Sequence, residues 1–171
     1  MKGHTFTIPA GTMLLLAACS DSTGPHIGSL QQALAHANVT LSESVRAGEA
    51  SLTGSMAVKA ALLVDADPIY SVNALGQGTL HDVRVDIVSG VVTASRELGA
   101  GADPCPGSIP LADAIAAAEA RVKGSAVKVQ PDDDDQCLRE VQVLDGSTLW
   151  EVKLARDGAV LEVEKADGDG N

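Results

Sequence analysis

The chain has 171 residues, of which 45% are hydrophobic but only 2% aromatic, and it carries a formal net charge of −11. Aliphatic side chains must therefore form most of any core. The acidic balance argues against a nucleic-acid partner, because affinity for nucleic acid depends on basic side chains that neutralise phosphates. It also argues against electrostatic binding to anionic lipid, whereas a cationic partner or a divalent ion remains compatible with it.

The N-terminal residues have the layout of a secretory signal. A positively charged start, Met1–His4, precedes the apolar run Met13–Ala18, which ends at Cys19. That run is too short to cross a bilayer as a helix, which needs about 20 apolar residues. The segment Leu16–Cys19 resembles the lipobox that bacterial signal peptidases cleave before a lipidated cysteine.

We therefore predict that residues 1–18 are a lipoprotein signal peptide and that Cys19 carries a diacylglyceryl and palmitate-type anchor. Residues 19–39 would form a tether with a possible short helix at 29–37. The alternative is an ordinary signal of the A-x-A type with an incidental cysteine. The lipoprotein interpretation places the mature domain outside the cytoplasm, in the bacterial cell envelope.

The cysteine count fits this location. Once Cys19 is assigned to lipid, Cys105 and Cys137 remain as a pair. Such a pair is expected to oxidise outside the cytosol, so we predict a disulfide between them, the alternative being two separate thiols. We expect the bridge to tie a linker to the second half of the chain.

An internal repeat organises the mature chain, with a first unit at residues 40–98 and a second at 109–165. Apolar residues match apolar ones, charges keep their sign, and the offset between the units shifts only from 70 to 68. The equivalent residues are Leu41, Glu43, Val45, Glu49, Gly54, Val72, Thr79, Leu80, Asp82, Val83, Arg84 and Val85 in the first unit and Leu111, Asp113, Ile115, Glu119, Gly124, Val141, Thr148, Leu149, Glu151, Val152, Lys153 and Leu154 in the second.

Each unit is predicted to form a helix followed by three or four antiparallel strands. In the second unit, apolar spacing predicts a helix over 111–122 that stops at Gly124. Alternating segments predict strands at 126–129, 141–143, 150–154 and 159–163. The fold class is therefore α+β, two tandem copies of a helix packed on a small antiparallel sheet. Residues 99–108 are a Gly- and Pro-rich linker, and 166–171 are expected to be a disordered tail.

The units resemble the PepSY domain. The resemblance lies in the helix, the glycine that follows it, and a closing hairpin of the form Val-Asp-x-x-[Ser/Thr]-Gly-x-Val. The first unit carries this pattern as Val85–Val92; in the second, Ala155 replaces the aspartate and Asp157 the hydroxyl residue. The resemblance implies a binding module found in peptidase propeptides and exported bacterial proteins, without catalytic residues to transfer.

The chemistry-bearing residues give little sign of an active site. The acidic run Asp132, Asp133, Asp134 and Asp135 could offer oxygen ligands to calcium, but four adjacent aspartates cannot all face one ion, so a solvated loop is favoured. His26, His36 and His81 lack metal-ligand spacing, so we expect no cofactor. Trp150 shares a strand face with Val152, which favours a core position over an exposed anchor.

Two functions from different classes follow. The favoured one is a membrane-anchored, non-catalytic module that binds an envelope protein, as in regulation or inhibition of a peptidase. The alternative is an envelope sensor of a ligand or divalent ion that uses the acidic loop. An uncharacterised hydrolase is the third option.

The predicted anchor has a direct test. Cys19→Ser should move the protein from the membrane to the soluble fraction, because the lipid is the only membrane attachment we predict. Intact-mass measurement of the native protein should show lipid on a chain that begins at Cys19. A mature chain that begins elsewhere, or an unmodified Cys19, would show the prediction to be wrong.

Overall fold

The structure is a computed structural model that describes residues 26–166. The described residues form three helices and eight strands. In chain order these are α1 (Ile27–His36), α2 (Leu41–Ala50), β1 (Met56–Leu63), β2 (Ile69–Gly76), β3 (Thr79–Asp86), β4 (Val92–Ala100), α3 (Leu111–Val122), β5 (Ser125–Pro131), β6 (Arg139–Asp145), β7 (Thr148–Leu154) and β8 (Val160–Lys165).

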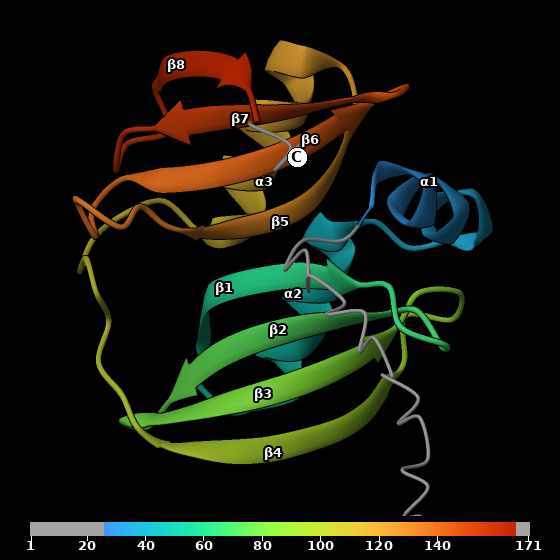
Figure 1. Ribbon diagram of the computed structural model, residues 1–171. Helices are drawn as coiled ribbons and strands as arrows, with labels where there is room; N and C mark the ends of the chain where they lie inside the picture. Colours follow the sequence, from blue (N-terminus) through green and yellow to red (C-terminus); the bar gives the residue numbers. More distant parts are fainter. Residues whose placement is uncertain (1–25, 167–171) are drawn as a thin grey trace, which may run out of the picture.

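All eight strands form one antiparallel sheet with the order β4-β3-β2-β1-β5-β6-β7-β8. Strands β1 and β5 meet at its centre, where Ala60 is opposite Val129. Helices α2 and α3 lie side by side behind the sheet, and α1 lies at one end of the strands (Figure 1). The fold is α+β, as predicted, but the two half-sheets are joined into a single layer.

The two halves, α2 with β1–β4 and α3 with β5–β8, have the same order of elements and share several local irregularities. Helices α2 and α3 both bury the first, second, fourth, fifth and eighth residues of the helix. The register shifts after Ala57 in β1 and after Ala126 in β5. In both halves a helix glutamate reaches the start of the first strand: Glu49 accepts a hydrogen bond from the Ala57 N–H (2.8 Å) and Glu119 from the Ala126 N–H (2.9 Å). The two halves thus match in these local features of the helix and of the first strand.

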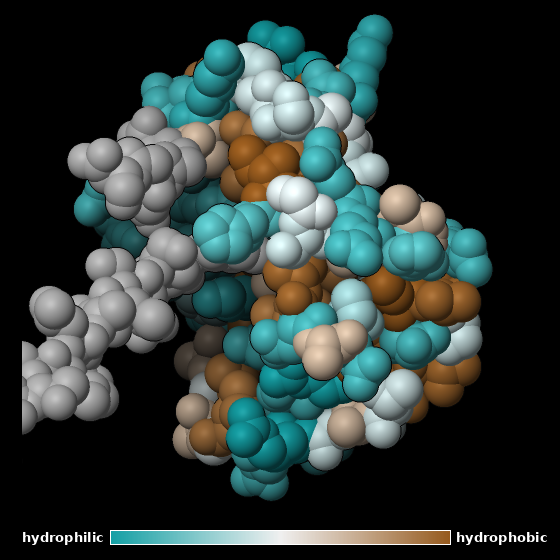
Figure 2. Space-filling view, turned by 45° about the vertical axis from the view of Figure 1, so that its right-hand side comes forward, coloured by the Kyte–Doolittle hydropathy of each residue, from teal (hydrophilic) through white to brown (hydrophobic). Residues whose placement is uncertain are grey.

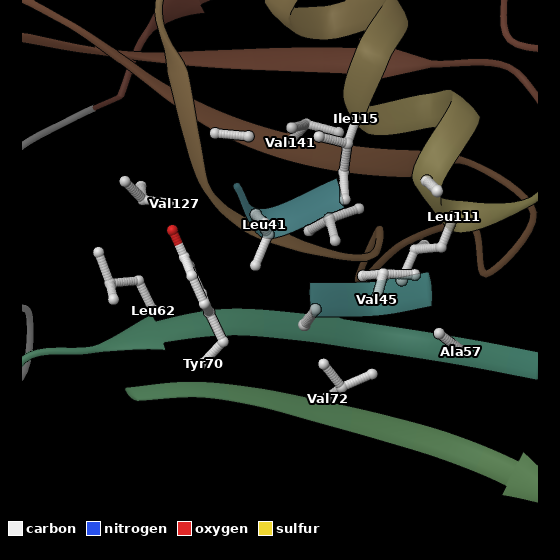
Figure 3. Close-up of a cluster of buried hydrophobic side chains, with 14 of the residues drawn as sticks. Leu41, Val45, Ala57, Leu62, Tyr70, Val72, Leu111, Ile115, Val127 and Val141 are labelled. Atoms are coloured by element: carbon white, nitrogen blue, oxygen red, sulfur yellow. The ribbon is translucent and has the colours of Figure 1, made fainter. Parts of the chain in front are cut away.

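One aliphatic core fills the space between the sheet and the helices. Helix residues such as Leu41 and Ile115 point toward strand residues such as Val72 and Val141 (Figure 3), and all four are almost fully buried. The Ser42 hydroxyl donates a hydrogen bond to the Ala112 carbonyl (3.3 Å), which links the two helices at their close approach. Because this core spans both halves, burial in one half depends on the other.

Several element boundaries differ from the prediction. Strands β5 and β6 are longer than the predicted 126–129 and 141–143, and β4 includes the first residues of the predicted linker. The residue that ends α3 in the left-handed conformation is Lys123 (φ 63°), not Gly124. Gly124 instead lets two backbone segments approach closely, because a Cβ placed there would clash with the Leu144 carbonyl oxygen.

Two glycine substitutions test this packing. Gly124→Ala should destabilise the protein by roughly 1–3 kcal/mol, because the Leu144 backbone would have to move. Gly28→Ala in α1 is the matched control: nothing lies within 4 Å of its added Cβ, so it should be neutral or stabilising by up to about 1 kcal/mol. Denaturant unfolding measures both. Equal effects of the two substitutions would contradict the close approach at Gly124.

Candidate binding surface

Among residues 26–166, one face of the sheet carries no helix, and we call it the open face. Strand residues alternate, so those next to the buried Val72, Val83 and Val152 point away from the helices. Polar side chains dominate the central positions of the open face. These are Lys59, Ser71, Asn73, Asp82, Arg84 and Arg96 in the first half, and Lys128, Gln130, Glu140, Gln142, Glu151, Lys153, Glu162 and Glu164 in the second.

In the first half, basic residues surround one buried carboxylate. Asp82 accepts a hydrogen bond from the Ser71 hydroxyl (2.6 Å) and forms a salt bridge with Arg84 (2.8 Å). Arg96, whose side chain is 73% exposed, lies 3.8 Å from the same carboxylate. With Lys59, this half therefore presents three cations and one already paired carboxylate.

In the second half, carboxylates outnumber cations. Burial raises the pKa of Glu151, and the nearby carboxylates of Glu140 and Glu164 raise it further. Lys153 could compensate this charge, but its ammonium group lies 2.9 Å from Asp132, in the neighbouring loop. The two halves of the open face thus carry net charges of opposite sign, although their strands pair in the same order.

Asp132, the first residue of the acidic run, has a structural role. Asp132 is buried; besides its salt bridge with Lys153 it accepts hydrogen bonds from the N–H groups of Asp134 (2.9 Å) and Asp135 (3.0 Å). The hydrogen bond from Lys153 is the main reason why the pKa of Asp132 is lowered. The prediction of a solvated loop is wrong for Asp132, because Lys153 balances its charge, whereas Asp133, Asp134 and Asp135 are exposed.

Within residues 26–166, no group of three or more His, Cys, Asp or Glu side chains is arranged to hold a metal ion. The three histidines of the described residues lie in separate places: His26 and His36 flank or end α1, and His81 is in β3. Cys19 lies outside the described residues. No helix in the described part of the chain is long and apolar enough to span a membrane.

The structure contains the predicted Cys105–Cys137 disulfide, with the Cα atoms 4.9 Å apart. The bridge joins the linker before α3 to the loop between β5 and β6. Beside it, the buried Arg139 donates hydrogen bonds to the Ser108 hydroxyl (3.0 Å) and the Gln136 carbonyl (2.9 Å). No sequence signal distinguished Arg139, since its environment depends on two segments far apart in the chain.

The hairpin pattern that prompted the PepSY resemblance has a physical role. Asp86 accepts hydrogen bonds from the N–H and hydroxyl of Ser89 (2.7 and 2.6 Å), and Gly90 has a positive φ of 70°. These interactions shape a turn that packs against Val39, two residues before α2, because a Cβ at Gly90 would lie 3.2 Å from the Val39 side chain. In the second half Gly158 (φ 87°) approaches Ile109 in the same way. The pattern thus fixes the entry of each helix.

Trp150 does not lie in the core, contrary to the prediction. It is half-buried, and the ammonium group of Lys165 on the edge strand lies 6.0 Å from the centre of its ring. Trp150 does follow the alternation that buries Val152, but it lies nearer the end of its strand. The alternation of strand residues correctly predicted that Trp150 lies on the same face as Val152, but it could not predict how deeply Trp150 is buried.

The two outer strands, β4 and β8, are the edges of the sheet, and no strand of the described residues pairs with their outer sides. Every residue of β4 is exposed or partly exposed, and Leu98 on β4 and Leu161 on β8 are exposed apolar side chains. On the side of the molecule turned forward in Figure 2, hydrophobic residues form separate patches between hydrophilic ones. The edges therefore combine unpaired backbone groups with local apolar contacts, as strand-adding partners require.

The shifted carboxyl groups predict opposite pH effects. Burial raises the pKa of Glu151 above its ordinary 4.5, so ionisation opposes folding, and Glu151→Gln should stabilise the protein at pH 7. Hydrogen bonds from Thr40 lower the pKa of Glu43 in the α2 capping box, so Glu43→Gln should destabilise at pH 7. The Glu151 difference should fade as the pH falls through its raised pKa and then through the ordinary 4.5, whereas the Glu43 difference should fade only as the pH falls further, through its lowered pKa. Unfolding curves measured from pH 7 down to pH 2 would contradict this if either difference kept its size throughout.

Comparison with known proteins gives a family match for the second half. Residues 108–169 match the family described as PepSY: Peptidase propeptide and YPEB domain. No curated protein matches the chain. A crystal structure from Clostridium difficile 630, described as that of "a putative lipoprotein", is similar with a TM-score of 0.46 and 14% identity, over 76% of this chain and 95% of that chain. The second half of this chain is therefore similar to the PepSY domain.

Proposed function

We propose that this protein is a lipid-anchored, non-catalytic module of the bacterial cell envelope that binds another envelope protein, with an exported peptidase as the favoured partner class. The observation that carries the proposal is the match of residues 108–169 to the peptidase propeptide and YPEB family. The equivalent helix, turn and strand order of residues 40–98 supports the further proposal that the chain holds two PepSY-like units.

The envelope location is proposed from the N-terminal signal and the disulfide. Cys19 follows a lipobox-like run, and a Cys105–Cys137 bridge suits an oxidising compartment. Residues 20–26 separate Cys19 from α1, and even fully extended they reach only about 25 Å. The proposed anchor would thus keep the folded domain close to its membrane.

Binding without catalysis is proposed because the prominent polar residues already have structural partners. Asp82 is paired with Arg84, Asp132 with Lys153, and the two cysteines with each other. The free strands β4 and β8 offer backbone donors and acceptors to an extended segment of a partner. We therefore assign the partner contact to these edges.

Photo-crosslinking in the native envelope tests the assignment. A photoreactive residue at Ser95 in β4 or Leu161 in β8 should form an adduct with an envelope protein, and the same residue at Arg121, exposed on α3, is the matched control. The captured protein should be a peptidase whose activity falls saturably when the purified chain is added.

Adducts of equal yield at Arg121 and at both edges would contradict the edge assignment. Saturable hydrolysis of a substrate by the purified chain itself, abolished by one point substitution, would contradict the non-catalytic role. If no peptidase is captured and calcium instead binds tightly, with loss on Asp133→Asn and Asp134→Asn, the ion-sensor function replaces the proposal.

A further inference from the structure

The two halves of the open face carry opposite net charge at equivalent backbone positions. At some equivalent positions the two halves carry the same charge; Asp82 of the first half, for example, corresponds to Glu151 of the second. At three equivalent positions the charge differs, and in each case the second half has a carboxylate that the first half lacks. The differing pairs are Ser71 and Glu140, Ala94 and Glu162, and Arg96 and Glu164. The central polar positions therefore hold three cations and one carboxylate in the first half, and two cations and four carboxylates in the second.

The strand register orders these charges in rows that run across the sheet. One row includes Arg84 in the first half and Glu151 in the second. The next row includes Asp82 and Arg96 in the first half and Lys153 and Glu162 in the second. The rows are continuous because Ala61 of β1 is paired with Lys128 of β5 at the centre.

We propose that the open face binds a second copy of this chain, face to face, about a twofold axis that runs along the strands between β1 and β5. This axis superimposes the basic half of one copy on the acidic half of the other. It brings Arg84 toward Glu151, Asp82 toward Lys153, and Arg96 toward Glu162 of the second copy. A twofold axis across the strands would instead stack halves of like charge, which costs affinity.

The size of the face suits a stable dimer. Eight strands at a spacing of about 4.8 Å, with roughly seven residues each at about 3.4 Å, cover about 900 Å². A specific protein interface buries about that area on each partner. At physiological salt the Debye length is about 8 Å, so the facing charges still interact while the remaining charges of the acidic chain are largely screened.

The position of α1 agrees with the same axis. The Val39 N–H donates to the Ile87 carbonyl (3.1 Å) just beyond β3, and the Gln31 amide donates to the Gly146 carbonyl (2.8 Å) just beyond β6. Strands β3 and β6 run in the same direction, so α1 lies at the end of the sheet where both finish (Figure 1). An axis along the strands keeps α1 of both copies at one end, which lets both Cys19 lipids enter one membrane. This step alone rests on the proposed anchor.

Charge reversal tests the dimer. The protein in density-matched nonionic detergent should sediment as a dimer, and Arg96→Glu or Glu162→Arg alone should each raise the dissociation constant about tenfold. The double variant restores opposite charges across the interface and should recover the affinity to within about threefold. Both residues are exposed, so neither change should unfold the chain. Arg121→Glu on the helix side is the control and should leave the dissociation constant unchanged.

A wild-type chain that stays monomeric up to about 0.1 mM would overturn the proposal, since a face of this size should bind more tightly. A dimer that is indifferent to both single reversals, or that the double variant fails to recover, would overturn it as well. The outcome is independent of the envelope partner, because the crosslinks at Ser95 and Leu161 lie on edges that the face-to-face dimer leaves free. It is also independent of the anchor, because mass in detergent does not depend on a membrane.

Discussion

The structure depends on the antiparallel pairing of β1 with β5. Each half alone would be a four-stranded sheet with one helix, and a unit of about 60 residues buries too little surface to be more than marginally stable. Pairing Ala60 with Val129 closes the inner edge of both half-sheets and brings α2 beside α3. The helices then share one aliphatic core, and small residues such as Ser42 and Ala112 let them approach each other closely.

Much of the local structure could be predicted from sequence, because it depends on neighbouring residues. The helix beginning after Thr40, with Glu43 three residues into the capping box, is of this kind, and so are the Asp-Gly turns. The recurrence of Glu49 and Glu119 pointed to an equivalent role, and both accept a hydrogen bond from the start of the following strand. The repeated glutamate thus indicated a repeated hydrogen bond between the helix and the strand that follows it.

What could not be predicted depends on contacts distant in sequence. Nothing in the pattern of β1 or β5 specifies which edges of the two half-sheets pair. Asp132 could not be separated from its three exposed neighbours, because its partner Lys153 lies on strand β7, distant in the sequence. Gly124 was assigned to the helix end, although its real constraint is the Leu144 backbone. The same limit applies to the candidate surface, whose two charged halves become visible only when the strand register is known.

The two halves also show how one backbone accommodates different chemistry. At equivalent positions at the start of β2 and β6, Tyr70 donates its hydroxyl to the Val39 carbonyl (3.0 Å), whereas Arg139 reaches the Ser108 hydroxyl. At one end of the sheet α1 covers the core with Leu30, and at the other the linker does so with the buried Cys105 and its disulfide. In both halves, these residues connect the segment before the helix to the sheet and cover one end of the core. Because these contacts fall on the helix side, the open face could diverge in charge while the arrangement of helices and strands was kept.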